Sequence, residues 1–98
     1  MRGSKRLSQI SRFIKLKAVR GHIQVQIKVR GQRPIVKLSN VTDGLTAFER
    51  NALLIHFYKV FERMKLESWT PAQVRAEIEG TNYAEVFGSP WGLDGRAA

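Results

Sequence analysis

Nine consecutive residues, 22–30, alternate between polar and apolar side chains without a break. A period of two is that of a β-strand, in which successive side chains point to opposite faces. The apolar set, which needs a core, consists of Ile23, Val25, Ile27 and Val29. The opposite set is polar and partly cationic, and consists of Gln24, Gln26, Lys28 and Arg30. The stretch therefore predicts the central strand of a small sheet that is covered on one face and open on the other.

Turn residues on both sides of this strand predict a three-stranded antiparallel meander. The dipeptide Arg20-Gly21 precedes the strand, and glycine accepts the positive φ that a tight hairpin needs. A first strand is expected over residues 11–19, although the apolar spacing over residues 10–16 also fits a short helix. The next turn ends at Pro34, which lacks a backbone N–H and suits a strand start or an edge. A short third strand is expected over residues 35–38.

A long amphipathic helix is expected after turn residues at 40–44. Thr46 and Glu49 have the spacing of a capping box, which predicts a helix over residues 47–65. One broad apolar face of this helix consists of Leu53, Leu54, Phe57, Tyr58, Val60, Phe61 and Met64. A wide apolar face of this kind is typical of a core helix, and it provides a cover for the central strand.

A second capping signal predicts another helix shortly afterwards. Thr70 is placed as its N-cap, Pro71 as its first residue and Gln73 as the partner in a capping box. Gly80 is expected to end this helix in the left-handed conformation. A third, short helix is expected over residues 82–87.

The predicted fold class is α+β, with a three-stranded antiparallel sheet (β-β-β) covered on one face by a long helix and followed by one or two short helices. Ninety-eight residues are enough for one domain, which is expected over residues 10–88. A flexible basic arm is expected over residues 1–9, and a loop and tail over residues 89–98. Trp91 in that loop is a candidate contact for a partner protein.

The charge of the chain is strongly segregated. The net charge is +9, yet residues 1–42 contain eleven Lys and Arg and no Asp or Glu. Residues 43–98 contain six basic and eight acidic residues. Such segregation produces a positive field on one side of a molecule, and that field favours polyanionic partners.

Nucleic acid, with duplex DNA favoured over RNA, is therefore the predicted partner of the polar sheet face. Arg and Lys neutralise phosphates, and Gln side chains can bond base edges. The expected contact residues are Lys15, Lys17, Arg20, Gln24, Gln26, Lys28, Arg30, Arg33 and Lys37 of the sheet and its turns, with Arg2, Lys5 and Arg6 of the arm. Lys37 is expected to point the same way as the other strand residues of this set. No aromatic residue occupies an expected outward strand position, so stacking of bases on the sheet is not predicted.

Three strands followed by a helix is also the element order of small DNA-binding domains such as the arm-binding domains of tyrosine recombinases. The chain is similar to them in element order and charge alone.

A protein–protein module is the main alternative. The basic face would then bind an acidic protein surface, as in a small regulator or inhibitor, and an open sheet face also permits a homodimer. The two last helices could be interpreted as a helix-turn-helix, but residues 82–87 carry one Glu and no cation, whereas a groove-reading helix needs positive charge.

Catalysis and cofactors are not expected. His22 and His56 could serve a metal-free ribonuclease as acid or base, but no pair of carboxylates has a spacing that indicates acid–base chemistry or metal binding. The chain has no Cys, which excludes disulfides and thiolate metal sites and fits a cytoplasmic protein. It also has no apolar run of membrane-spanning length, so no membrane partner is expected.

Overall fold

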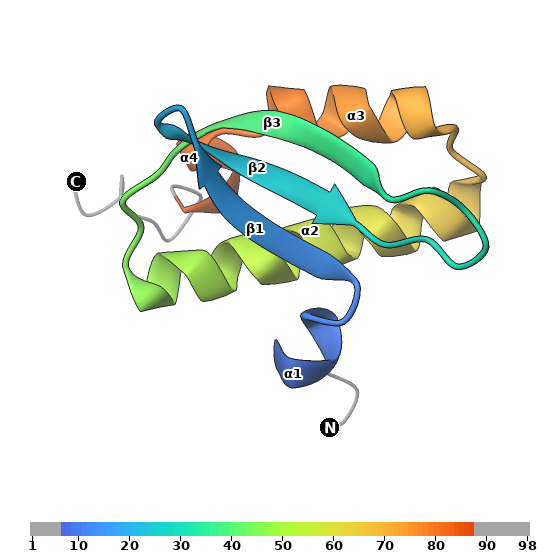
Figure 1. Cartoon of the computed structure of the whole chain (residues 1–98), viewed down its shortest axis with the longest axis horizontal. Helices are drawn as coiled ribbons and strands as arrows, with labels where there is room; N and C mark the ends of the chain where they lie inside the picture. The colour runs from blue at the N-terminus through green and yellow to red at the C-terminus, as the bar shows by residue number, and fades with distance from the viewer. Residues whose placement is uncertain (1–6, 88–98) are drawn as a thin grey trace.

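The computed structural model of the chain describes residues 7–87. Its elements, in chain order, are α1 (Leu7–Ile10), β1 (Ile14–Val19), β2 (His22–Ile27), β3 (Ile35–Thr42), α2 (Ala47–Glu67), α3 (Pro71–Gly80) and α4 (Tyr83–Val86). The strands form one antiparallel sheet in the order β1-β2-β3, which appears as a single twisted layer in Figure 1. The predicted α+β fold, with a meander followed by a long helix and short helices, is confirmed.

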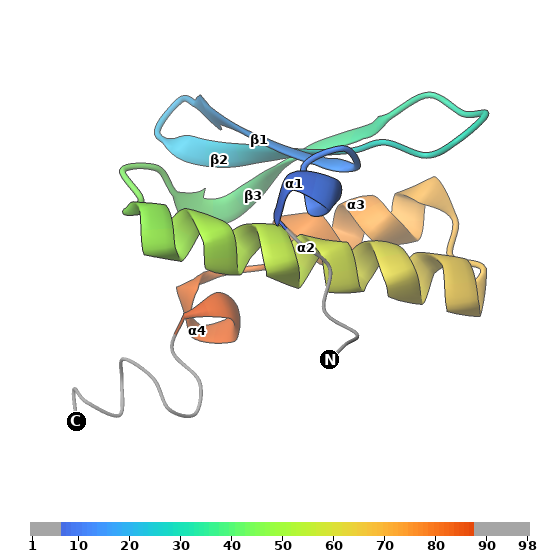
Figure 2. The same cartoon turned by 90° about the horizontal axis from the view of Figure 1, so that it is seen from below.

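The four helices lie on one side of the sheet. Figure 2 shows the sheet above, α2 running beneath it, and α4 on the side of α2 away from the sheet. Helix α3 packs along β3. The core between these layers includes Val25 and Ile27 of β2 and Leu53 and Phe57 of α2, all fully buried. Among residues 7–87, no helix covers the opposite face of the sheet.

The turn between β1 and β2 is a two-residue hairpin. Val19 pairs with His22, and the residues between them, Arg20 and Gly21, have φ values of 53° and 83°. Positive φ at both central positions is the type I′ geometry, whose twist matches that of the flanking strands. The hairpin predicted from Arg20-Gly21 is confirmed.

Strand β3 is longer than predicted and contains an irregularity. Thr42 pairs with His22 and Leu38 with Gln24, so β3 has two more residues than β2 over this interval. The Ser39 side chain, which is 2% exposed, donates to the Ile23 carbonyl at 2.8 Å. The Val41 N–H donates to the same Ser39 hydroxyl at 3.2 Å. Ser39 therefore satisfies backbone groups at this irregularity, which explains why a strand can run through a segment with turn-like composition.

Both predicted capping boxes are present. At α2, Thr46 Oγ1 accepts from the Glu49 N–H at 3.1 Å, and the Thr46 N–H donates to Glu49 Oε1 at 3.0 Å. Thr70 and Gln73 make the same reciprocal pair at α3. These bonds satisfy two of the N–H groups that the first turn of each helix leaves without partners.

The predicted left-handed end of α3 at Gly80 is wrong. Gly80 remains helical, and the C-cap is Thr81 in an extended conformation. Its hydroxyl donates to the Glu77 carbonyl at 2.8 Å, and its N–H donates to the Ile78 carbonyl at 3.2 Å. Thr81 thus satisfies the last carbonyls of the helix, and the glycine does not need to reverse the chain.

Of residues 10–16, for which the sequence left helix and strand open, residues 14–16 are strand, whereas residues 11–13, predicted as strand, form a turn. A helix ends at Ile10, and the first strand begins at Ile14. Residues 7–9, predicted to belong to the arm, are helical in α1. The remaining arm residues, including Arg2, Lys5 and Arg6, lie outside the described residues, as does Trp91.

Replacement of Ser39 by Ala tests the account of the β3 irregularity. We expect S39A to lower the free energy of unfolding by about 1–3 kcal/mol, because two buried backbone groups lose their partner. N40A, at the adjacent exposed position, is the control and should change stability by less than about 0.5 kcal/mol. Urea denaturation followed by circular dichroism measures both, and an equal effect of the two substitutions would contradict the account.

Candidate nucleic-acid interface

Two matching rows of side chains cross the open face of the sheet. In the first row, Lys15 of β1 lies opposite Gln26 of β2, which lies opposite Val36 of β3. The second row runs from Lys17 through Gln24 to Leu38. Residues paired across an antiparallel ladder point to the same face, so each row presents a cation, an amide and an aliphatic side chain. We call these six side chains the outer face.

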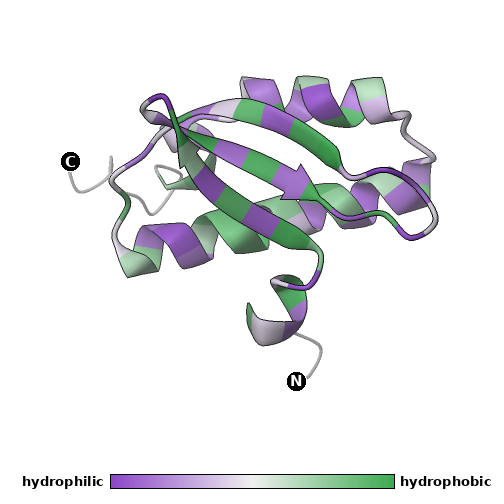
Figure 3. Ribbon diagram, viewed as in Figure 1, coloured by the Kyte–Doolittle hydropathy of each residue, from purple (hydrophilic) through white to green (hydrophobic). Residues whose placement is uncertain are grey.

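The outer face is accessible. Lys15, Lys17 and Val36 are exposed, and Gln24, Gln26 and Leu38 are half-buried between their neighbours. Figure 3 shows hydrophilic and hydrophobic residues alternating along β1 and β2, as expected when one side of each strand is buried and the other is open. The alternating pattern from residue 22 predicted this face of β2 correctly.

The prediction that Lys37 shares this face is wrong. Lys37 lies opposite Val25, whose side chain is fully buried, and therefore points to the helical side of the sheet. There its Nζ lies 3.8 Å from Glu79 Oε1 of α3. The partly exposed ion pair allows a lysine to occupy the inner side of an edge strand beside α3. Val36 and Leu38 consequently point outward, which sequence reasoning missed.

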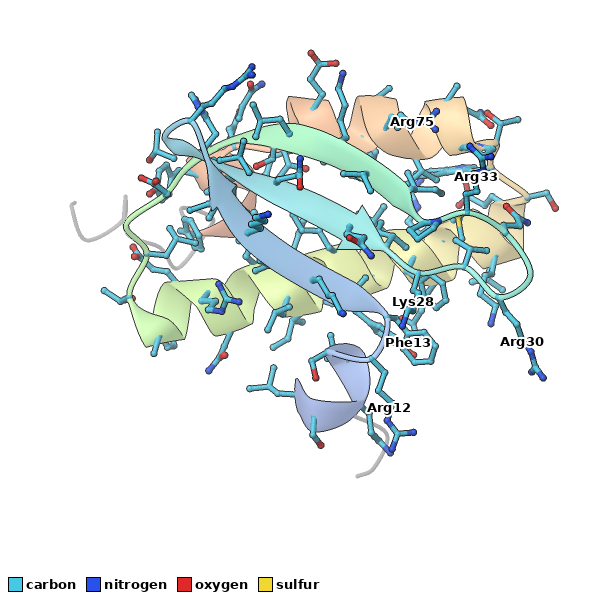
Figure 4. The ribbon with its side chains drawn as sticks, in the orientation of Figure 1. Arg12, Phe13, Lys28, Arg30, Arg33 and Arg75 are labelled. Carbon is cyan, nitrogen blue, oxygen red and sulfur yellow. The ribbon has the colours of Figure 1, made fainter. Side chains whose placement is uncertain are left out.

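Further cations lie at both ends of the sheet. Arg20 is in the hairpin turn at one end. At the other end, Lys28 follows β2, and Arg30 and Arg33 belong to the loop before β3. Figure 4 shows Lys28 beside the start of β1, close to Arg12, and Arg30 and Arg33 on opposite sides of the loop. The cationic surface therefore extends beyond the two rows.

The segregation of charge along the sequence becomes a separation in space. Residues 7–42, which form the sheet and α1, contain eight Lys and Arg and no carboxylate. The seven Asp and Glu of residues 43–87 belong to the helices and the turn that precedes α2. Within residues 7–87, Lys37 is the one cation of the sheet layer with a carboxylate within 4.0 Å. The positive charge of the outer face is thus largely uncompensated by the described residues.

Phe13 is a second feature that sequence reasoning missed. It lies directly before Ile14 and out of phase with the buried positions of β1, and its side chain is 37% exposed. Its ring stacks on Phe61 of α2, with centroids 5.3 Å apart. Phe13 lies in the turn before β1 and its ring contacts α2, so strand alternation alone could not have placed it.

The two histidines do not form a catalytic arrangement. His22 lies at the hairpin, where its Nδ1 is 3.4 Å from the Arg20 carbonyl. His56 lies on α2 under α4, and its Nε2 is 3.4 Å from the Thr81 hydroxyl. In the described part of the chain, no three His, Cys, Asp or Glu side chains gather closely enough to hold a metal ion. The hydrogen bonds of the two histidines within residues 7–87 go to a backbone carbonyl and a hydroxyl, respectively.

Helices α3 and α4 do not form a groove-reading unit. Helix α3 packs on β3, whereas α4 packs on α2. Asn82 caps α4 by accepting from the Glu85 N–H at 3.2 Å, which accounts for the polar residues at its start. The structure thus gives no support to the helix-turn-helix interpretation.

Comparison with protein-family models, curated proteins and solved structures finds no match to this chain. Among residues 7–87, no helix combines the length and the apolar character needed to cross a membrane. The interpretation of the outer face therefore depends on its own geometry and charge.

Burial lowers the pKa of His56 from its usual value of 6.5, with a smaller lowering by Lys59. Glu85 and Glu77 oppose this shift. Because the unfolded chain then binds a proton at His56 more readily than the folded one, stability falls as pH drops below 6.5.

The pH dependence of unfolding tests the environment of His56. From about pH 7 to about pH 5.5 the free energy of unfolding should decrease, and H56Q should flatten this dependence, because the residue that titrates is gone. H22Q, which removes the hairpin histidine, is the control for the loss of an imidazole as such. Urea denaturation at several pH values measures the effect. A wild-type slope in H56Q would contradict the assignment.

Proposed function

We propose that the chain is a non-catalytic nucleic-acid-binding protein that binds duplex DNA through its outer face. The observation that carries the proposal is the pair of cation–amide–aliphatic rows on a sheet face that no helix of residues 7–87 covers. Phosphates attract the lysines, and the amides have the donor and acceptor groups that base edges require.

The dimensions of the sheet suit the major groove of B-form DNA. Adjacent strands lie about 4.8 Å apart, so three strands span about 10 Å between their backbones. The major groove is about 12 Å wide and admits an α-helix or a two-stranded β-ribbon, and β1 with β2, which bear the lysines and the glutamines, form such a ribbon. The major groove of A-form RNA is narrow and deep, and side chains cannot read it. These dimensions favour duplex DNA over duplex RNA.

Within each row, we assign phosphate contact to the lysine and base contact to the glutamine. Lys15 and Lys17 stand on the edge strand β1, where they can reach one phosphate backbone. Gln24 and Gln26 stand on the central strand, where base edges would lie. Two residues along a strand rise by about 6.8 Å, close to the spacing of two base pairs at about 3.4 Å each. Each glutamine could therefore address a different base pair.

Removal of the two β1 lysines tests the electrostatic part of the proposal. K15Q combined with K17Q should weaken duplex binding roughly ten- to a hundredfold at about 0.1 M salt and reduce the log–log salt slope by about 1.8. Titrations of a labelled duplex at several salt concentrations measure both quantities.

The charge-matched control for this pair is K59Q combined with K65Q, which changes two exposed lysines of α2. We expect the control to keep the wild-type salt slope. Equal losses in the two double variants would show that net charge alone matters and would contradict binding by the outer face. Absence of duplex binding by the unmodified protein at low salt would overturn the proposed function.

Substitution of the glutamines tests base reading. Q24A combined with Q26A should erase any preference for particular base pairs in a randomised duplex library, while the salt slope stays unchanged. Each bidentate contact between Gln and adenine contributes about 1–3 kcal/mol of discrimination, so the preference should be strongest at A·T pairs. A preference that survives in the double variant would assign base reading to other residues.

A further inference from the structure

A shallow hollow lies at the end of the sheet, between the start of β1 and the loop that follows β2. Its volume is about 440 Å³, and it is lined by Phe13, Lys28, Val29, Arg30, Gln32 and Pro34. Phe13, Val29 and Pro34 supply apolar surface, and Lys28 and Arg30 add two cations. The hollow therefore combines an apolar floor with positive charge at its border.

The aromatic ring of Phe13 lines this hollow and is fixed by contacts with α2. Its ring stacks on Phe61 at an interplanar angle of 21°, and the Tyr58 ring centroid lies 6.2 Å away. Phe13 lines the hollow, whereas Phe61, on which its ring stacks, does not. The Phe13 backbone is fixed as well, because its carbonyl accepts from the Lys28 N–H at 2.7 Å. A ring supported in this way loses little freedom when a ligand stacks on it.

The charges around this ring match those of a nucleic-acid strand. Figure 4 shows Arg12, Phe13 and Lys28 grouped where β1 begins, with Arg30 further out on the loop. None of these three cations has a carboxylate of residues 7–87 within 4.0 Å. An aromatic face beside several free cations suits a planar base whose flanking phosphates need neutralisation. An uncharged apolar side chain of a protein ligand would gain nothing from these cations.

We propose that this hollow binds an unpaired base of a single-stranded extension on the bound duplex, with the base stacked on Phe13 and its phosphates beside Lys28 and Arg30. The inference rests on the proposed function, because it requires a duplex bound on the outer face. Lys28 follows Gln24 and Gln26 at the next alternate position of the chain, so it lies where that face ends. A duplex on the outer face that ends at this edge of the sheet would deliver its extension to the hollow. The protein would thus prefer a junction of double and single strands to a blunt duplex.

Paired substrates test the inference. The unmodified protein is titrated with a blunt duplex and with the same duplex carrying a short extension that contains 2-aminopurine, whose fluorescence is quenched by stacking. We expect the extension to improve binding about tenfold, within the range for stacking of one base on an aromatic side chain. F13L keeps an apolar side chain in place, and should remove both the improvement and the quenching while binding of the blunt duplex is unchanged.

The matched control is F48L, at a phenylalanine that is 69% exposed on α2 and does not line the hollow. We expect it to keep the improvement. R30Q, at an exposed loop position, is a second test that spares the aromatic cluster and should reduce the improvement without loss of folding, as checked by circular dichroism.

The outcomes separate this inference from the proposed function. Equal affinity for blunt and extended duplexes would overturn the inference and leave duplex binding intact, as would equal effects of F13L and F48L. Absence of salt-sensitive binding to either duplex would overturn the proposed function itself. Binding of an acidic, tryptophan-containing peptide that F13L abolishes, with no effect of the extension, would assign the hollow to a protein partner and would also overturn the inference.

Discussion

The packing of one face of β2 against α2 is the interaction on which the rest of the structure depends. Val25 and Ile27 of β2 and Leu53 and Phe57 of α2 are fully buried between the sheet and the helices. Because side chains alternate along a strand, the same packing that buries Val25 and Ile27 holds Gln24 and Gln26 outward. The candidate interface is thus a direct consequence of the core.

The carboxylates of the described residues lie in the helices and the turn before α2, which leaves the charge of the open sheet face positive. Three of these carboxylates have local structural roles: Glu49 caps α2, Glu79 pairs with Lys37, and Glu67 pairs with Arg63 and accepts from the Trp69 indole at 3.0 Å. None of these contacts reaches the outer face. These carboxylates therefore make contacts on the helical side of the sheet, and the positive field remains on its open side.

The sequence was most informative where one physical signal dominated. The alternation of β2 predicted the face of each of its residues, and the boxes at Thr46 and Thr70 predicted the starts of α2 and α3 because capping depends on neighbouring residues alone. Strand β3 was harder to predict. Its inner positions include Lys37 and Ser39, whose partners, Glu79 and the Ile23 carbonyl, are distant in sequence. Hydropathy assigned Lys37 to the wrong face because it cannot anticipate an ion pair with Glu79, which belongs to a helix distant in sequence.

The same reasoning explains which parts of the candidate site were and were not predictable. Lys15, Lys17 and the two glutamines follow from local alternation, whereas the aliphatic residues Val36 and Leu38 depend on the pairing of β3. Phe13 depends on a third element, because Phe61 of α2 supports its ring from below the sheet. Different residues therefore stabilise the fold and form the candidate interface. Buried groups such as Ser39 fix the pairing of β2 with β3, whereas Lys15 and Lys17 of the outer face are exposed. Substitutions on the outer face should consequently change binding while leaving the fold in place, which makes binding measurements on such variants directly interpretable.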